Sequence, residues 1–145
     1  MSDTTNALLQ QMSQARDRIV SQGRAIRIMV DLSDNGRRQR ARDLVVQGKV
    51  VWVREDDGII HAGVAGSDAN VEYPVSITLK EREDGSFRAR GHLCTCYDHG
   101  RAGACKHVLA AVGEWFLEKR REWFRLRDAE NILAGALPAA QLEAA

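Results

Sequence analysis

The stretch His92–Val112, "HLCTCYDHGRAGACKHVLAAV", contains all three cysteines of this 145-residue chain. Their spacing is Cys94-x-Cys96, then eight intervening residues, then Cys105-x-His107. Two short pairs of donors separated by a loop match the tetrahedral Cys and His sets of structural zinc sites. The spacing therefore predicts a closed Zn²⁺ site whose ligands are Cys94, Cys96, Cys105 and His107.

The residues around the two pairs suit such a site. Gly100 and Gly103 allow the loop to turn, so that the second pair returns toward the first. The second pair lies where a helix is predicted to begin, and helix N-terminal amides stabilise thiolates. Three thiolates and one neutral imidazole leave a zinc site with a charge of about −1, which favours neighbouring cations. We therefore expect Arg101 and Lys106 close to the metal.

Two other interpretations of the cluster remain open. The cysteines could be three buried side chains beside a histidine at a helix start. Alternatively, one cysteine could be a nucleophile paired with His107 or His99, which leaves the other two cysteines unexplained. His99 is also an alternative fourth ligand, but it lies in the middle of the loop beside Asp98. His61 and His92 occupy ordinary strand positions.

Composition limits the class of protein. The chain has 21 Lys and Arg against 20 Asp and Glu, so its net charge of +1 provides no protein-wide field to attract nucleic acid or membrane. Apolar residues make up 44%, which is typical of one folded domain. No stretch approaches the roughly 18 apolar residues of a membrane span, and the N-terminal residues do not show a basic n-region followed by an apolar h-region. We expect a cytoplasmic protein without disulfides or membrane contact.

Hydrophobic periodicity predicts a helix over Asn6 to about Gln22, because Leu8, Met12, Ala15 and Ile19 share one face. Gly23 is expected to end it. The following segment, "RAIRIMVDL" at 24–32, places apolar residues at alternate positions and favours a strand, although Ile26, Met29 and Val30 would also share a helix face.

Two further helices are predicted. The first, "GRRQRARDLVVQG" at 36–48, would be capped by Ser33 or Asp34 and closed by Gly48. The second runs from Lys106 to about Leu126, with apolar residues facing a core at Val108, Val112, Trp115 and Phe116. The alanine-rich tail, 129–145, is expected to fray.

Four strands are predicted between these helices, at "KVVWVRE" (49–55), "IIHAGVA" (59–65), "VEYPVSITLK" (71–80) and "SFRARGHLC" (86–94). The intervening turns contain Gly, Asp and Asn, which tolerate positive φ in hairpins. Pro74 cannot donate to a ladder, so its strand lies at an edge or presents that position outward. The sequence thus predicts an α+β fold with a small antiparallel meander flanked by helices.

The donor spacing resembles the SWIM zinc finger, whose pattern is C-x-C, a variable loop and C-x-H. The resemblance extends upstream through "ARDLVVQGKVVWV" and "AGVAGSDANVEYPVSITL", and covers roughly Arg40 to Trp115. It implies a ββα finger closed by zinc, with a role in binding DNA or protein. Residues 36–128 would form this domain, after an N-terminal extension at 1–35 and before the tail at 129–145.

Two basic segments offer surfaces for nucleic acid, since arginine pairs with phosphates and aromatic faces stack on bases. In the second, which surrounds Trp123 and Phe124, Glu118 and Glu122 would equally explain a solvated helix face. The first segment contains Arg37, Arg38, Arg40 and Arg42. The second contains Lys119, Arg120, Arg121, Arg125 and Arg127.

These patterns lead to a functional hypothesis. We expect a non-enzymatic zinc-finger accessory protein that contacts nucleic acid, with DNA as the first expectation, through Arg37 to Arg42, Arg101 and Lys106. The chain has no phosphate-binding G-x-x-x-x-G-K-[ST] motif. The alternative is a protein-interaction module whose N-terminal helix and Trp123 and Phe124 face dock on an ATPase, a recombinase or a second copy.

Overall fold

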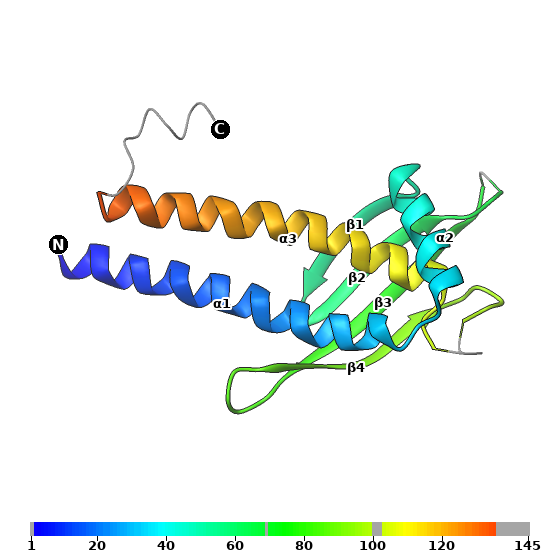
Figure 1. Ribbon diagram of the computed structural model, residues 1–145, viewed down its shortest axis with the longest axis horizontal. Helices are drawn as coiled ribbons and strands as arrows, with labels where there is room; N and C mark the ends of the chain where they lie inside the picture. The colour runs from blue at the N-terminus through cyan, green and yellow to red at the C-terminus, as the bar shows by residue number, and fades with distance from the viewer. Residues whose placement is uncertain (1, 69, 100–102, 136–145) are drawn as a thin grey trace. The chain divides into compact units, whose positions relative to one another are not determined.

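The computed structural model describes residues 2–68, 70–99 and 103–135, and within them the chain is an α+β fold of three helices and one four-stranded antiparallel sheet (Figure 1). The elements follow in the order α1 Asp3–Asp31, α2 Asn35–Val46, β1 Val50–Asp56, β2 Ile59–Ala65, β3 Glu72–Glu81, β4 Phe87–Cys94 and α3 Lys106–Leu133. The predicted fold class is confirmed. None of the helices in the described ranges is both long enough and apolar enough to cross a membrane.

The chain divides into two compact units, which we call the helical unit and the sheet unit. The helical unit comprises Met1–Val20 and Glu118–Ala145, and the sheet unit comprises Ser21–Leu117. Helices α1 and α3 contribute residues to both. Every described residue that is buried belongs to the sheet unit. The domain boundaries suggested by the sequence stay a prediction.

The sheet is the predicted meander, with strand order β1-β2-β3-β4 and antiparallel pairing throughout. The β1–β2 connection is a two-residue turn in which Asp57 and Gly58 have φ of 48° and 77°. Positive φ at both positions is the geometry that joins strands with a right-handed twist. Asp57 and Gly58 therefore form the hairpin turn that was predicted between these strands.

Pro74 lies in the central strand β3, so of the two arrangements expected for it the outward one applies. Pro74 is opposite Gly63 of β2, whereas the pairing of β3 with β4 ends one residue later, at Val75 and Cys94. Pro74 therefore has a strand neighbour on one side only. A missing N–H is tolerated at such a position.

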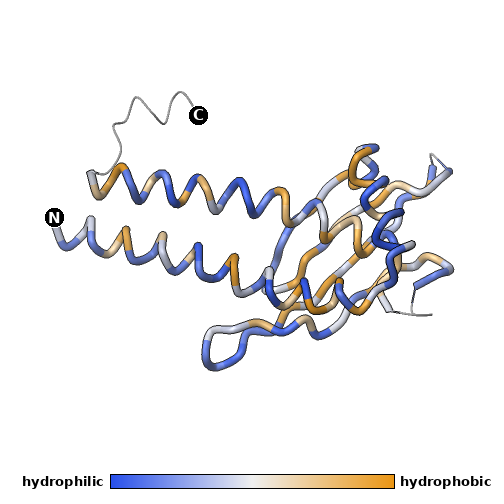
Figure 2. The backbone as a smooth tube through the Cα atoms, viewed as in Figure 1, coloured by the Kyte–Doolittle hydropathy of each residue, from blue (hydrophilic) through white to orange (hydrophobic). Residues whose placement is uncertain are grey.

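The core lies between the sheet and the helices of the sheet unit. Alternate residues of the two central strands are buried on one face, namely Ile60, Ala62 and Val64 of β2 and Val75, Ile77 and Leu79 of β3. Figure 2 shows the hydrophobic character of these strands and of the helical segments that cross them. Trp115 of α3 is 1% exposed. The alternating apolar residues of the strands thus pack against the apolar faces of the helices, which recur every 3.6 residues.

Helix α1 corrects two predictions, since it continues through Gly23 and includes most of the segment expected to be a strand. Ile26 and Met29 are buried, whereas Ile28 is 67% exposed, which is helical spacing rather than alternation. A glycine inside a helix costs only about 1 kcal/mol. A Cβ at Gly23 would lie 3.2 Å from Phe116, so the glycine permits α3 to pack closely. Tertiary packing therefore decides that this segment is a helix rather than a strand.

Helix α2 matches its prediction and α3 exceeds it. Asp34 caps α2, with its Oδ1 accepting a hydrogen bond from the Arg37 amide at 2.8 Å. Helix α3 begins at Lys106 as predicted, but it ends at Leu133 and so includes the start of the alanine-rich segment. The rest of that segment, 136–145, lies outside the described residues.

Candidate metal centre

The four predicted ligands come from the junction between β4 and α3. Cys94 is the last residue of β4, and Cys96 follows two residues later. Cys105 precedes α3, and its carbonyl accepts the amide of Leu109 at 3.1 Å. His107 lies in the first turn of α3. One pair of donors therefore lies at the end of β4 and the other at the start of α3.

The donor atoms of Cys94, Cys96, Cys105 and His107 all lie within 4.8 Å of one another. The Cys94 Sγ is 3.8 Å from the His107 Nδ1. Zn–S and Zn–N bonds of about 2.3 and 2.0 Å in a tetrahedron imply donor separations of roughly 3.5–3.8 Å. The cluster could thus bind a metal ion, and three sulfurs with one imidazole are a donor set that zinc takes in structural sites. His99, the alternative ligand, is outside this group.

A β-bulge in β4 turns Cys94 toward the core. Glu81 is opposite Phe87 at the start of the hairpin, but Thr78 is opposite Gly91 and Leu79 is opposite Ala89, so Arg90 is an extra residue. A one-residue shift moves every later side chain to the other face of a sheet. Cys94 consequently packs against the hydrophobic core, on the face that the helices cover.

The thiols of the cluster interact with one another. Hydrogen bonding from the Cys105 thiol lowers the pKa of Cys94, and the same bond raises the pKa of Cys105. Burial raises the pKa of Cys96. Cys105 is fully buried and His107 is 5% exposed. Adjacent buried thiolates repel one another, so ligation by all three cysteines would require the charge of a bound cation.

Tyr73 of β3 holds the imidazole of His107 in place. The two rings stack with their centroids 4.3 Å apart and an interplanar angle of 29°. Groups that orient a ligating histidine tune metal affinity. Tyr73 was not singled out in the sequence. The only sequence signal for a role is its position near the start of β3, at the open end of the β3–β4 hairpin.

We expect Tyr73→Ala to weaken zinc binding by about tenfold or more, as is typical for a residue that orients a metal ligand. Tyr73→Phe keeps the stacked ring and should bind zinc like the wild type. Competition with a chromogenic chelator measures both affinities. Equal affinities for the Ala and Phe variants would show that the ring does not position His107.

The loop that carries Cys96 is fastened to β4 and to α2. The His99 Nε2 lies 3.1 Å from the main-chain oxygen of His92, the geometry of a hydrogen bond donated by the imidazole. Burial, and then the proximity of His99, lowers the pKa of His92. On the other side, the Arg37 Nη2 is 3.0 Å from the Asp98 Oδ2. Both contacts were missed in the sequence, because neither follows a periodic pattern.

The structure separates the arginines of α2 into two groups. The Arg37 side chain is only 6% exposed and pairs with Asp34 and Asp98, so it is engaged within the protein. Arg38 is half-buried and donates to the Asn35 Oδ1 at 2.7 Å. Arg40 and Arg42 are exposed. Lys106 is half-buried at the start of α3, and Arg101 lies outside the described residues.

We expect Arg37→Ala to lower the free energy of unfolding by about 1–3 kcal/mol, because it removes hydrogen bonds to charged groups. Arg40→Ala, at an exposed position of the same helix, should change it by less than about 0.5 kcal/mol. Urea unfolding of the zinc-loaded protein measures both. Equal effects would contradict a structural role for Arg37.

The second basic segment lies in the helical unit. Arg16 of α1 donates two hydrogen bonds to Glu130 of α3, at 2.9 and 2.6 Å. The guanidinium groups of Arg16 and Arg127 lie 5.4 and 5.8 Å from the centroid of the Trp123 ring. Phe124 is 43% exposed. Part of this segment thus joins α1 to α3 within the unit.

The chain matches no family model, no curated protein and no solved structure. The functional interpretation therefore depends on the donor cluster and its surroundings.

Proposed function

We propose that this protein is a non-enzymatic, SWIM-type zinc-finger accessory protein that binds nucleic acid, with DNA as the first choice. The observation that carries the proposal is the Cys3His cluster in C-x-C and C-x-H spacing at the junction of β4 and α3. Bound zinc would neutralise the thiolates and cross-link the sheet to the helix. Four protein donors leave no position for a substrate, which favours a structural role.

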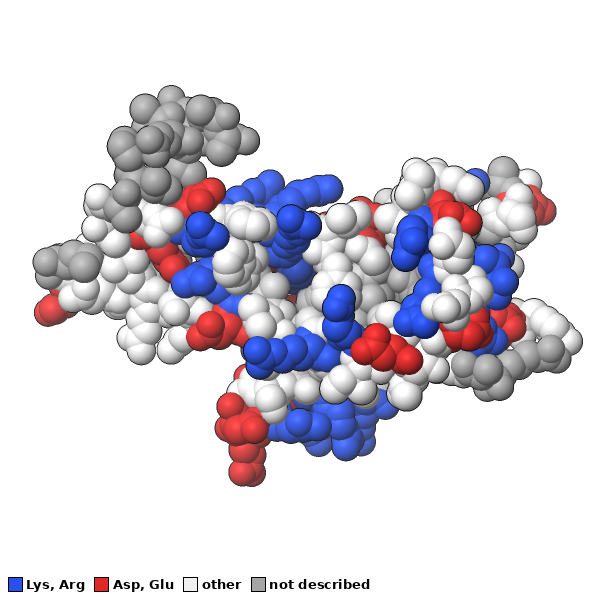
Figure 3. Space-filling view, viewed as in Figure 1, with Lys and Arg blue, Asp and Glu red and all other residues white. Residues whose placement is uncertain are grey.

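The nucleic-acid part of the proposal is supported by the link between α2 and the finger. The ion pair of Arg37 with Asp98 joins the basic helix to the loop between the ligand pairs. Arg40 and Arg42 remain exposed on α2. Figure 3 shows the scattered distribution of Lys and Arg, in keeping with the small net charge. Local clusters rather than a global field would attract phosphates.

A protein-docking function is the second candidate, and the helical unit favours it. No described residue of this unit is buried, although Leu8, Met12, Ala15 and Ile19 form an apolar stripe. Leu8 is 41% exposed, like Phe124 at 43%. A two-helix unit gains most of its stability by burying such a stripe. A further helix, from a DNA-processing protein or from a second copy, would complete that burial.

Titration of the zinc-loaded protein with single-stranded and duplex DNA and RNA at several salt concentrations tests the first candidate. We expect Arg40→Ala with Arg42→Ala to weaken binding at low salt by about tenfold, and to make the salt slope shallower by about 1–2, since each phosphate contact contributes roughly 0.9.

The matched control removes two exposed cations of the sheet, in Arg54→Ala with Lys80→Ala, and so keeps the net charge of the first variant. Equal weakening of both double variants would show that binding does not depend on α2. Absence of binding at low salt would reject the nucleic-acid proposal and favour the docking function.

A further inference from the structure

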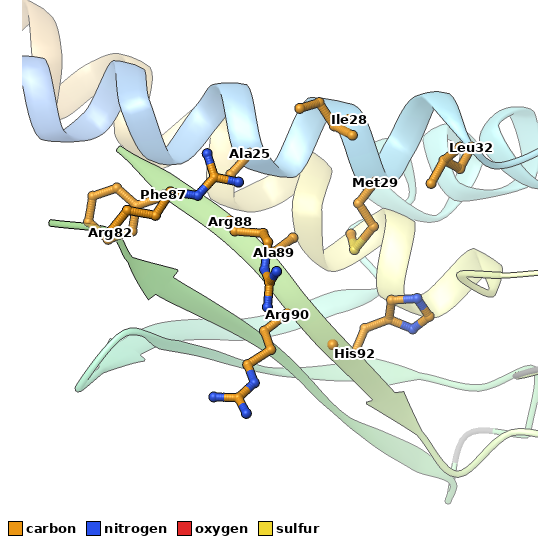
Figure 4. A pocket seen from close by; sticks show the side chains of 11 residues that line it. Ala25, Ile28, Met29, Leu32, Arg82, Phe87, Arg88, Ala89, Arg90 and His92 are labelled. Atoms are coloured by element: carbon orange, nitrogen blue, oxygen red, sulfur yellow. The ribbon is translucent and has the colours of Figure 1, made fainter. Parts of the chain in front are cut away.

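A groove with a volume of about 290 Å³ runs between α1 and β4 in the sheet unit (Figure 4). One wall is formed by Ile28, Met29 and Leu32 of α1. Figure 4 shows Met29 projecting from the helix toward the strand. The other wall follows β4 and the turn before it. The groove is separate from α2, to which the nucleic-acid surface was assigned above.

The charge of this groove has a single sign. Arg82, Arg88 and Arg90 line it, and none of the described lining residues is acidic. All three arginines are exposed. Asp84 in the adjoining turn offsets part of the charge of Arg82, so the positive field of the groove comes mainly from Arg88 and Arg90. The groove is therefore complementary to carboxylates or phosphates.

The apolar wall distinguishes between these two anions. Ile28 is 67% exposed and Leu32 is 80% exposed, so two aliphatic side chains border the arginines. The one phenylalanine in the lining, Phe87, is 6% exposed and presents little of its ring for stacking on a base. Single-stranded nucleic acid gains much of its affinity from aromatic stacking. Aliphatic and cationic groups together suit a polypeptide that carries both aliphatic and acidic side chains.

The edge of the sheet adds backbone hydrogen bonding. β4 is the last strand of the sheet, so half of its backbone groups point away from β3. His99 covers this edge at the main-chain oxygen of His92, and the bulge at Arg90 interrupts the regular pairing. Between the turn and the bulge, an added strand would pair with β4 at Ala89.

We propose that the groove between α1 and β4 binds an extended acidic segment of a partner protein, with aliphatic side chains alternating with its carboxylates. The carboxylates pair with Arg82, Arg88 and Arg90. The aliphatic side chains pack on Ile28 and Leu32, and the backbone pairs with β4 at Ala89. This site functions independently of the nucleic-acid surface on α2.

The test uses a fluorescein-labelled peptide in which Glu and Val alternate, and measures its binding to the zinc-loaded protein by fluorescence anisotropy. We expect Arg88→Glu with Arg90→Glu to raise the dissociation constant by at least about tenfold. The control, Arg40→Glu with Arg42→Glu, makes the same charge change on α2 and should leave the constant within about twofold. A peptide of alternating Glu and Gly should bind more weakly than the Glu and Val peptide.

Three results would overturn the proposal. One is equal loss of binding in the two double variants, and another is a wild-type protein that does not bind the peptide at low salt. The third is an oligothymidylate that requires Arg88 and Arg90 while the peptide does not, which would assign the groove to nucleic acid. Protection of the Ala89 amide from hydrogen exchange by the peptide is expected, and unchanged exchange would exclude strand addition.

Discussion

Cys105→Ser is expected to remove the bound zinc and to unfold the loop and the first turns of α3. Cys105 is fully buried, and it is one of four donors within 4.8 Å of one another. Structural zinc contributes about 10–16 kcal/mol in finger peptides, whereas a whole domain is stable by roughly 5–15 kcal/mol. Loss of the metal therefore removes most of the stabilisation at the junction of β4 and α3. Elemental analysis should fall from one zinc per chain to nearly none.

Histidines provide the matched control for this prediction. His107→Asn should lose zinc like the cysteine variant, whereas His61→Asn, at a half-buried position on β2 outside the cluster, should keep it. Circular dichroism and the fluorescence of buried Trp115 report the loss of structure. Full zinc occupancy with an unchanged helix signal in the His107 and Cys105 variants would refute the metal assignment.

Insertion of one alanine between Leu93 and Cys94 is expected to abolish zinc binding although all four ligands remain in the chain. In the wild type, the extra residue at Arg90 places Cys94 opposite Val75, on the face that the helices cover. The inserted alanine would lie opposite Val75, so Cys94 would lie opposite Pro74 and its side chain would point to the other face of the sheet. The first donor pair would then lose Cys94.

Deletion of Arg90 is the control, because it removes the extra residue and keeps Cys94 opposite Val75. In competition with a chelator, we expect the deletion variant to bind zinc with nearly wild-type affinity, and the insertion variant to bind at least about 100-fold more weakly. Wild-type affinity in the insertion variant would show that the loop can bring Cys94 to the metal from either face of the sheet.

Local patterns predicted most of the secondary structure. The alternation of β-branched residues and the turn residues between them located all four strands, and the meander was confirmed. Asp34 and Gly48 marked the two ends of α2. The error lay in α1, where Ile26, Ile28 and Val30 alternate although Ile26, Met29 and Val30 also share a helix face. The burial of Ile26 and Met29 and the close approach of Phe116 to Gly23 accompany the helix that continues through this segment.

The sequence predicted the four donors of the candidate metal centre but not the residues that position them. Spacing identified Cys94, Cys96, Cys105 and His107, and the structure brings them together. Tyr73 and Asp98 belong to other segments or to the loop, and their contacts depend on how these segments pack. The four arginines of α2 look equivalent in the sequence. Packing engages Arg37 and leaves Arg40 and Arg42 exposed.

The sequence by itself determined the α+β class, the order of the strands and the set of four donors, because periodicity and ligand spacing are local properties of the chain. The tertiary structure alone decided the register of β4. An uninterrupted hairpin would direct Cys94 to the solvent face, and the bulge at Arg90 directs it to the helices. Gly91 within a strand is the one local signal of that bulge. Because side chains alternate between faces, a single extra residue reverses the facing of every later residue in the strand. The packing of β4 between β3 and α1 selects which register exists.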